Sequence, residues 1–185
     1  MLTKFSRSEI QSLMWQAYGV AKRSPDPSSQ NGALLYHLPT KRIVAEACNT
    51  FPDGVEQTEE RWSNRDLKYP LVDHSEASVL WTAFRDGVFK YLDIKDMVMI
   101  CPWAACSGCA GTMIGFGLKN IIAHKQAMFC NHGKWEQDCD IAMIKMKEGG
   151  VIYEMYDGYV GSDITVRRDG KPFSPDNNVK PSKPT

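Results

Sequence analysis

The chain has no excess of charge and no membrane-length apolar run, and each absence narrows what the protein can be. Lys and Arg together number 22, and Asp and Glu also number 22, so the formal net charge is zero. A protein that binds mainly a nucleic-acid backbone usually carries a basic surplus, so this composition argues against a nucleic-acid partner. No stretch approaches the ~18 apolar residues of a membrane span, and residues 1–7 lack the apolar core of a signal peptide. We therefore expect a cytoplasmic protein with no membrane partner.

Histidine and cysteine are scarce, with four and six copies among 185 residues. This length favours one domain with a proper core. In a cytoplasmic protein, cysteines are better interpreted as metal ligands and reduced core thiols than as disulfides. Cys48 and Cys101 lie in apolar segments and are interpreted as core thiols.

Strand-like and helix-like segments alternate along most of the chain. Apolar spacing predicts helices over residues 8–22, 74–85, 106–116 and 135–147, and strands over 32–38, 42–47, 97–101, 120–123 and 151–155. Residues 51–69 are polar and charged and are expected to form a long loop. This alternation predicts an α/β sandwich. We expect one domain over residues 8–160, and an extended or disordered C-terminal tail over residues 161–185.

The most informative pattern is His74-Ser75-Glu76 followed by Cys106-Ser107-Gly108-Cys109. One imidazole and two thiolates can hold Zn²⁺ and leave the fourth position open for water, as a catalytic zinc site requires. Zinc lowers the pKa of a bound water to about 7, and Glu76 is then available to shuttle protons. The spacing is typical of zinc-dependent nucleobase deaminases.

Other interpretations of the same residues exist. A lone C-x-x-C also suits redox motifs and structural zinc sites. A structural site, however, usually has four protein ligands, and no second thiol lies near His74 in the sequence. The predicted helices beginning at His74 and Cys106 would also direct two positive helix ends at the metal, which favours thiolate ligands.

Four segments carry a resemblance to a known family. Residues 22–33 (KRSPDPSSQNGA) resemble its S-x-D-P-S-T-x-V-G-A segment, and residues 49–54 (NTFPDG) resemble its N-G-x-P-x-G loop. Residues 68–76 (KYPLVDHSE) resemble K-Y-P-x-V-x-H-A-E, and residues 103–110 (WAACSGCA) resemble W-x-P-C-x-x-C-A. On these residues the chain resembles the cytidine and deoxycytidylate deaminase superfamily, most closely the deoxycytidylate (dCMP) deaminases, including those encoded by phages.

The resemblance implies both a fold and an activity. The fold would be a three-layer αβα sandwich around a mixed five-stranded sheet, and the reaction would be the zinc-dependent hydrolysis of dCMP to dUMP. His74, Cys106 and Cys109 would hold Zn²⁺, Glu76 would be catalytic, and Asn49 would bind the nucleotide. The resemblance further implies a homo-oligomer, with a hexamer favoured, dCTP and dTTP as effectors, and the host cytoplasm as the location if a phage encodes the chain.

The chain departs from the family pattern at a few positions. Ala105 stands where the motif has proline before the first cysteine, and alanine can adopt the same φ. Thr50 replaces the glycine of the Asn49 loop, and a β-branched residue there narrows backbone freedom and adds bulk. This change puts regulation by dCTP and dTTP in question. Ser75 replaces the alanine of the H-A-E run.

Several further residues have two interpretations. Cys130, His132 and Cys139 could form a second metal site, although their spacing is irregular. Trp103 and, less directly, Trp62 are candidates for stacking on a base or for ordinary packing. The candidates for contact with a substrate phosphate, which otherwise belong to a solvated face, are Arg23, Arg61, Arg65 and Lys68.

Three classes of function therefore compete. The first is a deaminase of a free nucleotide, either dCMP or a modified cytosine nucleotide. The second is a deaminase that acts on a base in single-stranded nucleic acid or tRNA; the zero net charge and the residues 68–70 (KYP) count against it. The third is a zinc-binding module without activity, for which Glu76 would have no use.

Overall fold

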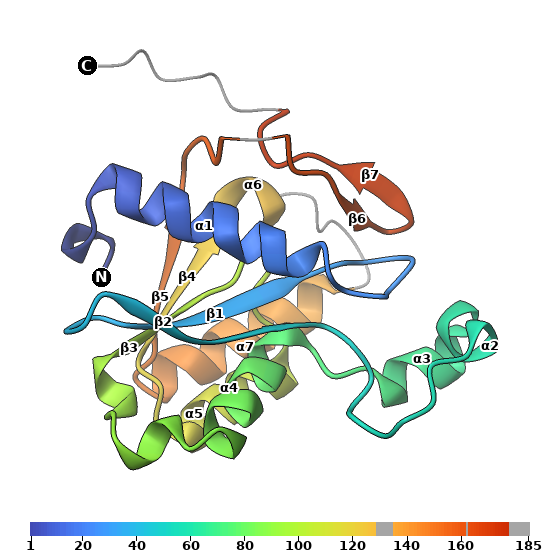
Figure 1. Cartoon of the computed structure of the whole chain (residues 1–185), viewed down its shortest axis with the longest axis horizontal. Coiled ribbons are helices and arrows are strands. Elements are labelled where there is room, and N and C mark those ends of the chain that lie inside the picture. Colours follow the sequence, from blue (N-terminus) through green and yellow to red (C-terminus); the bar gives the residue numbers. More distant parts are fainter. Residues whose placement is uncertain (129–134, 162, 178–185) are drawn as a thin grey trace.

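A single five-stranded sheet organises the molecule (Figure 1). The structure is a computed structural model and describes residues 1–128, 135–161 and 163–177. The sheet contains β1 (Gly32–His37), β2 (Arg42–Cys48), β3 (Met97–Ile100), β4 (Asn120–His124) and β5 (Ile152–Tyr156), in the spatial order β2-β1-β3-β4-β5. β1 is antiparallel to β2 and β3, whereas β3, β4 and β5 are mutually parallel. The predicted mixed five-stranded sheet is confirmed.

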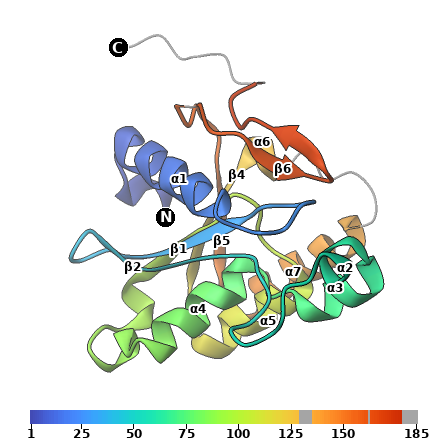
Figure 2. The same ribbon diagram turned by 45° about the vertical axis from the view of Figure 1, so that its right-hand side comes forward.

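Helices cover both faces of this sheet (Figures 1 and 2). On one face lies α1 (Arg7–Ala21), and on the other lie α4 (Ser75–Arg85), α5 (Ser107–Phe116) and α7 (Glu136–Glu148). Because side chains alternate along a strand, β1 contributes Leu34 and Tyr36 to the core under α1, and Ala33 and Leu35 to the core under α4. The predicted three-layer αβα sandwich is confirmed.

Local contacts hold α1 in place at both of its ends. The Ser6 side chain accepts a hydrogen bond from the Glu9 amide, and the Glu9 carboxylate accepts one from the Ser6 amide, which forms a capping box. At the other end, β1 begins at Gly32, where an added Cβ would lie 2.4 Å from the Ala17 carbonyl oxygen and from the Ala21 nitrogen. Only glycine therefore lets the strand approach the helix backbone this closely.

The strand directions bring distant segments to one edge of the sheet. β1 is antiparallel to both β2 and β3, so β2 and β3 run in the same direction. The residues that follow β2, the residues that follow β3 and the residues that precede β1 therefore meet at the same edge. Ligands in open α/β sheets bind at the carboxyl ends of the parallel strands, which is this edge.

Two expectations from the sequence were wrong in part. The expected loop over residues 51–69 contains α2 (Glu59–Ser63) and the start of α3 (Arg65–Leu71), capped by the side chains of Thr58 and Asn64. The expected tail contains an antiparallel hairpin of β6 (Val166–Arg168) and β7 (Lys171–Phe173), and Val166 and Ile164 are buried against the core under α1. These elements are too short for apolar periodicity to identify, and residues 178–185 lie outside the described part of the chain.

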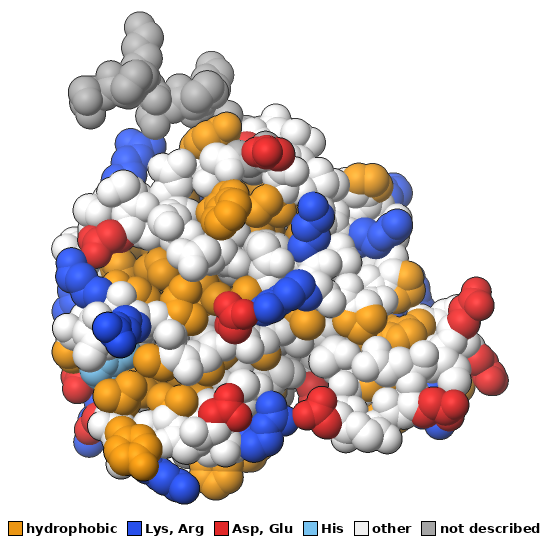
Figure 3. Space-filling model, viewed as in Figure 1, with side chains coloured by type: hydrophobic (Ala, Val, Ile, Leu, Met, Phe, Trp, Pro, Cys, Tyr) orange, Lys and Arg blue, Asp and Glu red, His pale blue; other side chains and the backbone are white. Residues whose placement is uncertain are grey.

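Short helices complete the architecture: η1 (Leu2–Lys4), η2 (Val88–Lys90), η3 (Ile94–Asp96) and α6 (Lys125–Met128). In the described part of the chain, none of the helices combines the length and apolar character that crossing a membrane takes. On the face shown in Figure 3, Lys and Arg side chains lie among Asp and Glu, and acidic side chains gather over α2 and α3. This face therefore has no continuous basic track.

Candidate metal and substrate site

Three candidate metal ligands meet at the edge of the sheet where β3 ends. His74 is the N-cap residue of α4, and Cys106 is the N-cap residue of α5. The His74 Nδ1 atom lies 3.3 Å from Cys106 Sγ and 3.6 Å from Cys109 Sγ, and the three ligand atoms lie within 4.8 Å of one another. One imidazole nitrogen and two sulfurs are a donor set that zinc prefers, so these residues fit a Zn²⁺ ion.

Hydrogen bonds within this group determine its charge. Hydrogen bonding from Cys109, reinforced by His74, lowers the pKa of Cys106 to about 4, and the same Cys106–Cys109 contact raises the pKa of Cys109. The hydrogen bond with Cys106 raises the pKa of His74 to about 9. The lowered pKa of Cys106 favours its thiolate, the form of cysteine that binds a metal.

Glu76 lies beside this group, in the first turn of α4, with 2% of its surface exposed. Burial raises the pKa of its carboxyl to about 6, although the nearby His74 opposes that rise. The Ser75 hydroxyl donates a hydrogen bond of 3.2 Å to the Glu76 carboxylate. An alanine at position 75, as in the resembled family, could not make this contact. A carboxyl group with a pKa of about 6 can both accept and release a proton near neutral pH.

Neighbouring elements hold the two cysteines in place. Asp138 of α7 accepts hydrogen bonds from the amide and the hydroxyl of Ser107, at the start of α5. The Tyr153 hydroxyl of β5 donates a hydrogen bond of 2.9 Å to the Ala104 carbonyl, and the Ala104–Ala105 peptide is cis. These hydrogen bonds hold the turn that leads to Cys106 and the first turn of α5, which carries Cys109.

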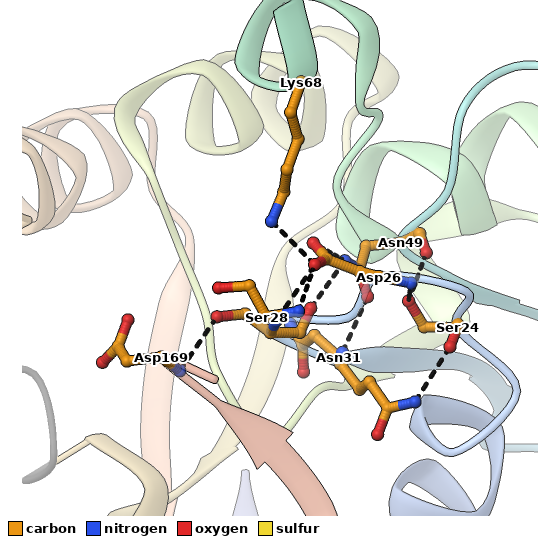
Figure 4. A network of polar contacts seen from close by, with 9 residues as sticks. Ser24, Asp26, Ser28, Asn31, Asn49, Lys68 and Asp169 are labelled. Atoms are coloured by element: carbon orange, nitrogen blue, oxygen red, sulfur yellow. Dashed lines mark hydrogen bonds and ion pairs between the residues drawn. The ribbon is translucent and has the colours of Figure 1, made fainter. Parts of the chain in front are cut away.

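A buried carboxylate organises the opposite side of the site (Figure 4). Asp26 is 3% exposed, and its Oδ1 atom accepts hydrogen bonds from the amides of Ser28 and Ser29 at 2.8 and 3.1 Å. The Lys68 ammonium of α3 lies 2.7 Å from the same oxygen. Asp26 thus ties the loop before β1 to α3.

Asn49 belongs to the same network. Its amide group donates to Asp26 Oδ2 at 3.3 Å and to the Ser29 carbonyl at 2.8 Å, and its oxygen accepts from the Asn31 amide at 2.7 Å. Both hydrogens of the amide are therefore used within the protein. The oxygen retains one lone pair for a bound molecule.

These residues surround one cavity of about 160 Å³. The sequence-predicted site residues that line it are His74, Glu76, Cys106, Asn49, Arg65, Lys68 and Trp103. Cys109 lies behind them and is buried. The structure thus brings the predicted metal, proton-transfer and nucleotide-binding residues to the same place.

Other candidates lie elsewhere or have other contacts. Arg23 forms an exposed ion pair with Glu46, and Arg61 donates to the Glu56 carbonyl, so neither lines the cavity. Trp62 stacks on Phe51 with a ring separation of 3.9 Å, which favours packing over base recognition.

Some of the remaining cysteines and histidines lie at the cavity, and others are buried in the core. Cys101 is buried, and burial raises the pKa of its thiol well above the usual range, as a core thiol requires. Cys139 lines the cavity, whereas Cys130 and His132 lie outside the described residues. A further histidine, His124 at the end of β4, forms hydrogen bonds with the Tyr18 hydroxyl and the Gly158 carbonyl and is structural.

Sequence reasoning missed several residues that line the cavity. Asp26, Tyr69 and Trp135 come from three separate segments, and Arg168 and Asp169 come from the C-terminal hairpin. The sequence does contain an indication of this hairpin, because Asp169-Gly170 is a preferred pair for a two-residue hairpin turn. Asp169 and Gly170 both have the positive φ that such a turn requires.

The Asp26–Lys68 pair predicts a large effect on stability. Lys68→Met would leave the buried carboxylate without its cation, so the free energy of unfolding should fall by about 3–5 kcal/mol. Urea denaturation measures this change, and the exposed Lys90→Met is the matched control. The double variant Asp26→Asn/Lys68→Met should recover part of the loss. A change below about 1 kcal/mol in Lys68→Met would show that the pair contributes little.

The fold and the site agree with comparisons with known proteins. A family model described as the cytidine and deoxycytidylate deaminase zinc-binding region matches residues 7–125. Deoxycytidylate deaminases of Mus musculus and Homo sapiens are 32% and 31% identical over 111 residues, covering 57% of this chain and 58% of each relative. The chain thus spans less than two thirds of the length of these curated relatives.

Solved structures share the fold. The dCMP deaminase of cyanophage S-TIM5 in complex with dCMP and dUMP aligns with a TM-score of 0.59 at 17% identity, covering 82% of this chain and 99% of that one. The apo form of that enzyme aligns with a TM-score of 0.56. The extent of the family match, together with the Zn²⁺-type ligand group that it contains, leads to one conclusion: the chain belongs to the cytidine and deoxycytidylate deaminase family.

Proposed function

We propose that the protein is a zinc-dependent hydrolase that converts dCMP and water to dUMP and ammonia. One observation carries the proposal: the three-ligand group of His74, Cys106 and Cys109 lies beside buried Glu76 in a single cavity. The likeness to deoxycytidylate deaminases over 111 residues supports the choice of dCMP. A cytosine nucleotide with a modified base would suit the same chemistry.

In the proposed mechanism, His74, Cys106 and Cys109 would hold Zn²⁺, which would supply the Lewis-acid chemistry that makes water a nucleophile at neutral pH. Glu76 takes the proton from that water and passes it to the ring nitrogen next to the reacting carbon. Glu76 then transfers the remaining proton of the added hydroxyl to the amine, so that the C–N bond breaks, ammonia leaves and the uracil carbonyl forms. The raised pKa of Glu76, about 6, suits a group that must both accept and donate protons.

The other cavity residues would bind and orient the substrate. The free lone pair of the Asn49 oxygen is available to a sugar hydroxyl, and Tyr69 and Trp135 supply aromatic surface. Arg65 is an exposed cation at the cavity and is available to a phosphate. Lys68 is already paired with Asp26, so we assign it to holding the cavity wall rather than to the phosphate.

The competing function is deamination of a base within a nucleic-acid strand. Such a substrate needs a charged track for its backbone beyond the cavity. Figure 3 shows mixed charges and a gathering of acidic side chains over α2 and α3, next to the cavity residues that α3 supplies. The charges on this face therefore favour a free nucleotide as the substrate, and we propose that the protein acts on it in the cytoplasm.

We also propose that the protein forms a homo-oligomer, with a hexamer favoured by the family resemblance. Trp81 and Phe84 of α4 are 53% and 63% exposed and pack edge-on against Phe116 of α5. A cluster of exposed aromatic side chains is typical of an interface between protein chains.

The ligand assignment predicts the metal content of two cysteine variants. The wild-type protein should bind about one Zn²⁺ per chain, and Cys106→Ser should lose most of it because a thiolate ligand is removed. Elemental analysis of the purified proteins measures this content. Cys48→Ser, which changes a thiol outside the cavity, should keep its zinc. Unchanged zinc in Cys106→Ser would remove this residue from the ligand set.

Replacement of the proton shuttle should separate activity from structure. Glu76→Gln keeps the shape of the side chain and should keep the fold and the zinc, yet lose at least about 10²–10⁴-fold in kcat. Ammonia release from dCMP measures the rate, and the exposed Glu59→Gln serves as control. A near-normal rate in Glu76→Gln would exclude Glu76 from the reaction.

Any regulation by dCTP and dTTP should be weaker than in typical relatives, or altered. Thr50 stands where the resembled loop has glycine, and its backbone pairs with Asp73 through hydrogen bonds of 3.2 and 2.9 Å, next to His74. The loop has therefore formed around a bulky residue without a positive φ. Hyperbolic rate curves against dCMP that are insensitive to both nucleotides would support this expectation. A sigmoidal curve that dCTP abolishes and dTTP restores would refute this, and Thr50→Gly tests for a gain of response.

A further inference from the structure

The C-terminal hairpin forms part of the cavity wall although it lies outside the segment that defines the family. The family model matches residues 7–125, whereas β6 and β7 span Val166–Arg168 and Lys171–Phe173. Arg168 and Asp169 nevertheless line the same cavity as His74 and Glu76. Figure 2 shows the hairpin beside the loop that leads into β1, and Figure 4 shows Asp169 reaching that loop. This wall therefore comes from outside the segment that the family model matches.

Hydrogen bonds fix the hairpin to the loop before β1. Gln30 and Arg167 form two hydrogen bonds of 3.0 Å: the Gln30 amide donates to the Arg167 carbonyl, and the Gln30 side-chain oxygen accepts from the Arg167 amide. The Gly170 amide donates to the Ser28 carbonyl at 2.9 Å. The Asp169 amide donates to the Ser29 hydroxyl at 3.3 Å. Ser28 and Ser29 also hold the Asp26 carboxylate. The hairpin thus belongs to the same rigid network as the rest of the cavity.

Strand alternation directs one of two adjacent arginines inward. Arg167 is exposed, whereas Arg168 is 9% exposed. The Arg168 guanidinium lies over the ring of Trp103, 4.0 Å from its centroid, and Phe173 packs on the same ring at 5.6 Å. Arg168 therefore occupies one face of Trp103. This cation–π contact holds the guanidinium at the cavity wall.

A guanidinium fixed in this way is suited to a phosphate. Its planar array of donors matches two phosphate oxygens, and burial strengthens the interaction. Lys68, the other buried cation of the wall, is held 2.7 Å from Asp26. Asp169 is exposed, so water screens its repulsion of an anion.

We propose that Arg168 is a specificity-determining residue that binds the phosphate of a nucleoside 5′-monophosphate in the cavity. The hairpin then makes the protein select a nucleotide over the corresponding nucleoside. This inference rests on the proposed deaminase function, because it assigns one group of that substrate to one residue.

The adjacent arginines supply a matched pair of variants. Arg168→Gln and Arg167→Gln remove the same charge from neighbouring positions of β6, one facing the cavity and one facing solvent. We expect Arg168→Gln to lower kcat/KM for dCMP by about 10–100-fold, the usual effect of losing a charge-assisted hydrogen bond. The value for deoxycytidine, which lacks the phosphate, should change little. Arg167→Gln should match the wild type on both substrates.

The results that would contradict the role of Arg168 differ from the result that would refute the deaminase function. Equal losses on dCMP and deoxycytidine would make Arg168 merely structural, and no loss on either would remove it from the site. A zinc-loaded wild type that deaminates neither compound would instead refute the proposed function. Calorimetric titration with dUMP and with deoxyuridine gives a second readout that needs no turnover.

A conservative variant covers the case in which Arg168→Gln fails to fold. Arg168→Lys keeps the charge but loses the planar donors and the stacked contact. It should bind dUMP several-fold more weakly than the wild type, with deoxyuridine binding unchanged. Weakened binding of both compounds, or of neither, would overturn the proposal.

Discussion

The buried carboxylate of Asp26 is the interaction on which the site depends. A charge with 3% exposure is costly unless it is paired and fully hydrogen-bonded, and Asp26 has Lys68, two backbone amides and Asn49 as partners. These partners come from α3, from the loop before β1 and from the end of β2. Because each partner must be in place to offset the cost of burial, one side chain fixes the relative positions of three segments.

The positions of two helices, rather than a buried ion pair, organise the metal group of His74, Cys106 and Cys109. His74 and Cys106 are the N-cap residues of α4 and α5, so the positive ends of two helices meet at the candidate zinc site. Tyr153 of β5 and Asp138 of α7 hold the turn and the helix start that carry the cysteines. The same arrangement buries Glu76 and raises its pKa to about 6. Ligand geometry and proton-transfer chemistry thus follow from the same helix positions.

The C-terminal hairpin of β6 and β7 connects the hydrogen-bond network of Asp26 with the metal group. Its backbone binds the loop that carries Ser28 and Ser29, and its Arg168 lies on Trp103, which follows β3 towards the cysteines. Segments more than 60 residues apart in the chain, at Arg168 and Trp103, therefore share one wall of the cavity. Since this hairpin lies beyond residues 7–125, the family's shared segment alone does not enclose the cavity.

Patterns within the chain were enough to predict the fold class, the long helices and strands, and the residues of the metal group. Apolar periodicity over ten or more residues and the fixed spacing of His74, Glu76, Cys106 and Cys109 are local properties, and local properties can be read from a chain. The folded molecule was needed to show that Lys68 pairs with Asp26, that the Asn49 amide is engaged within the protein, and that Arg168 lines the cavity. Each of these contacts joins segments that are far apart in sequence, and the strand order and helix packing determine which side chains meet.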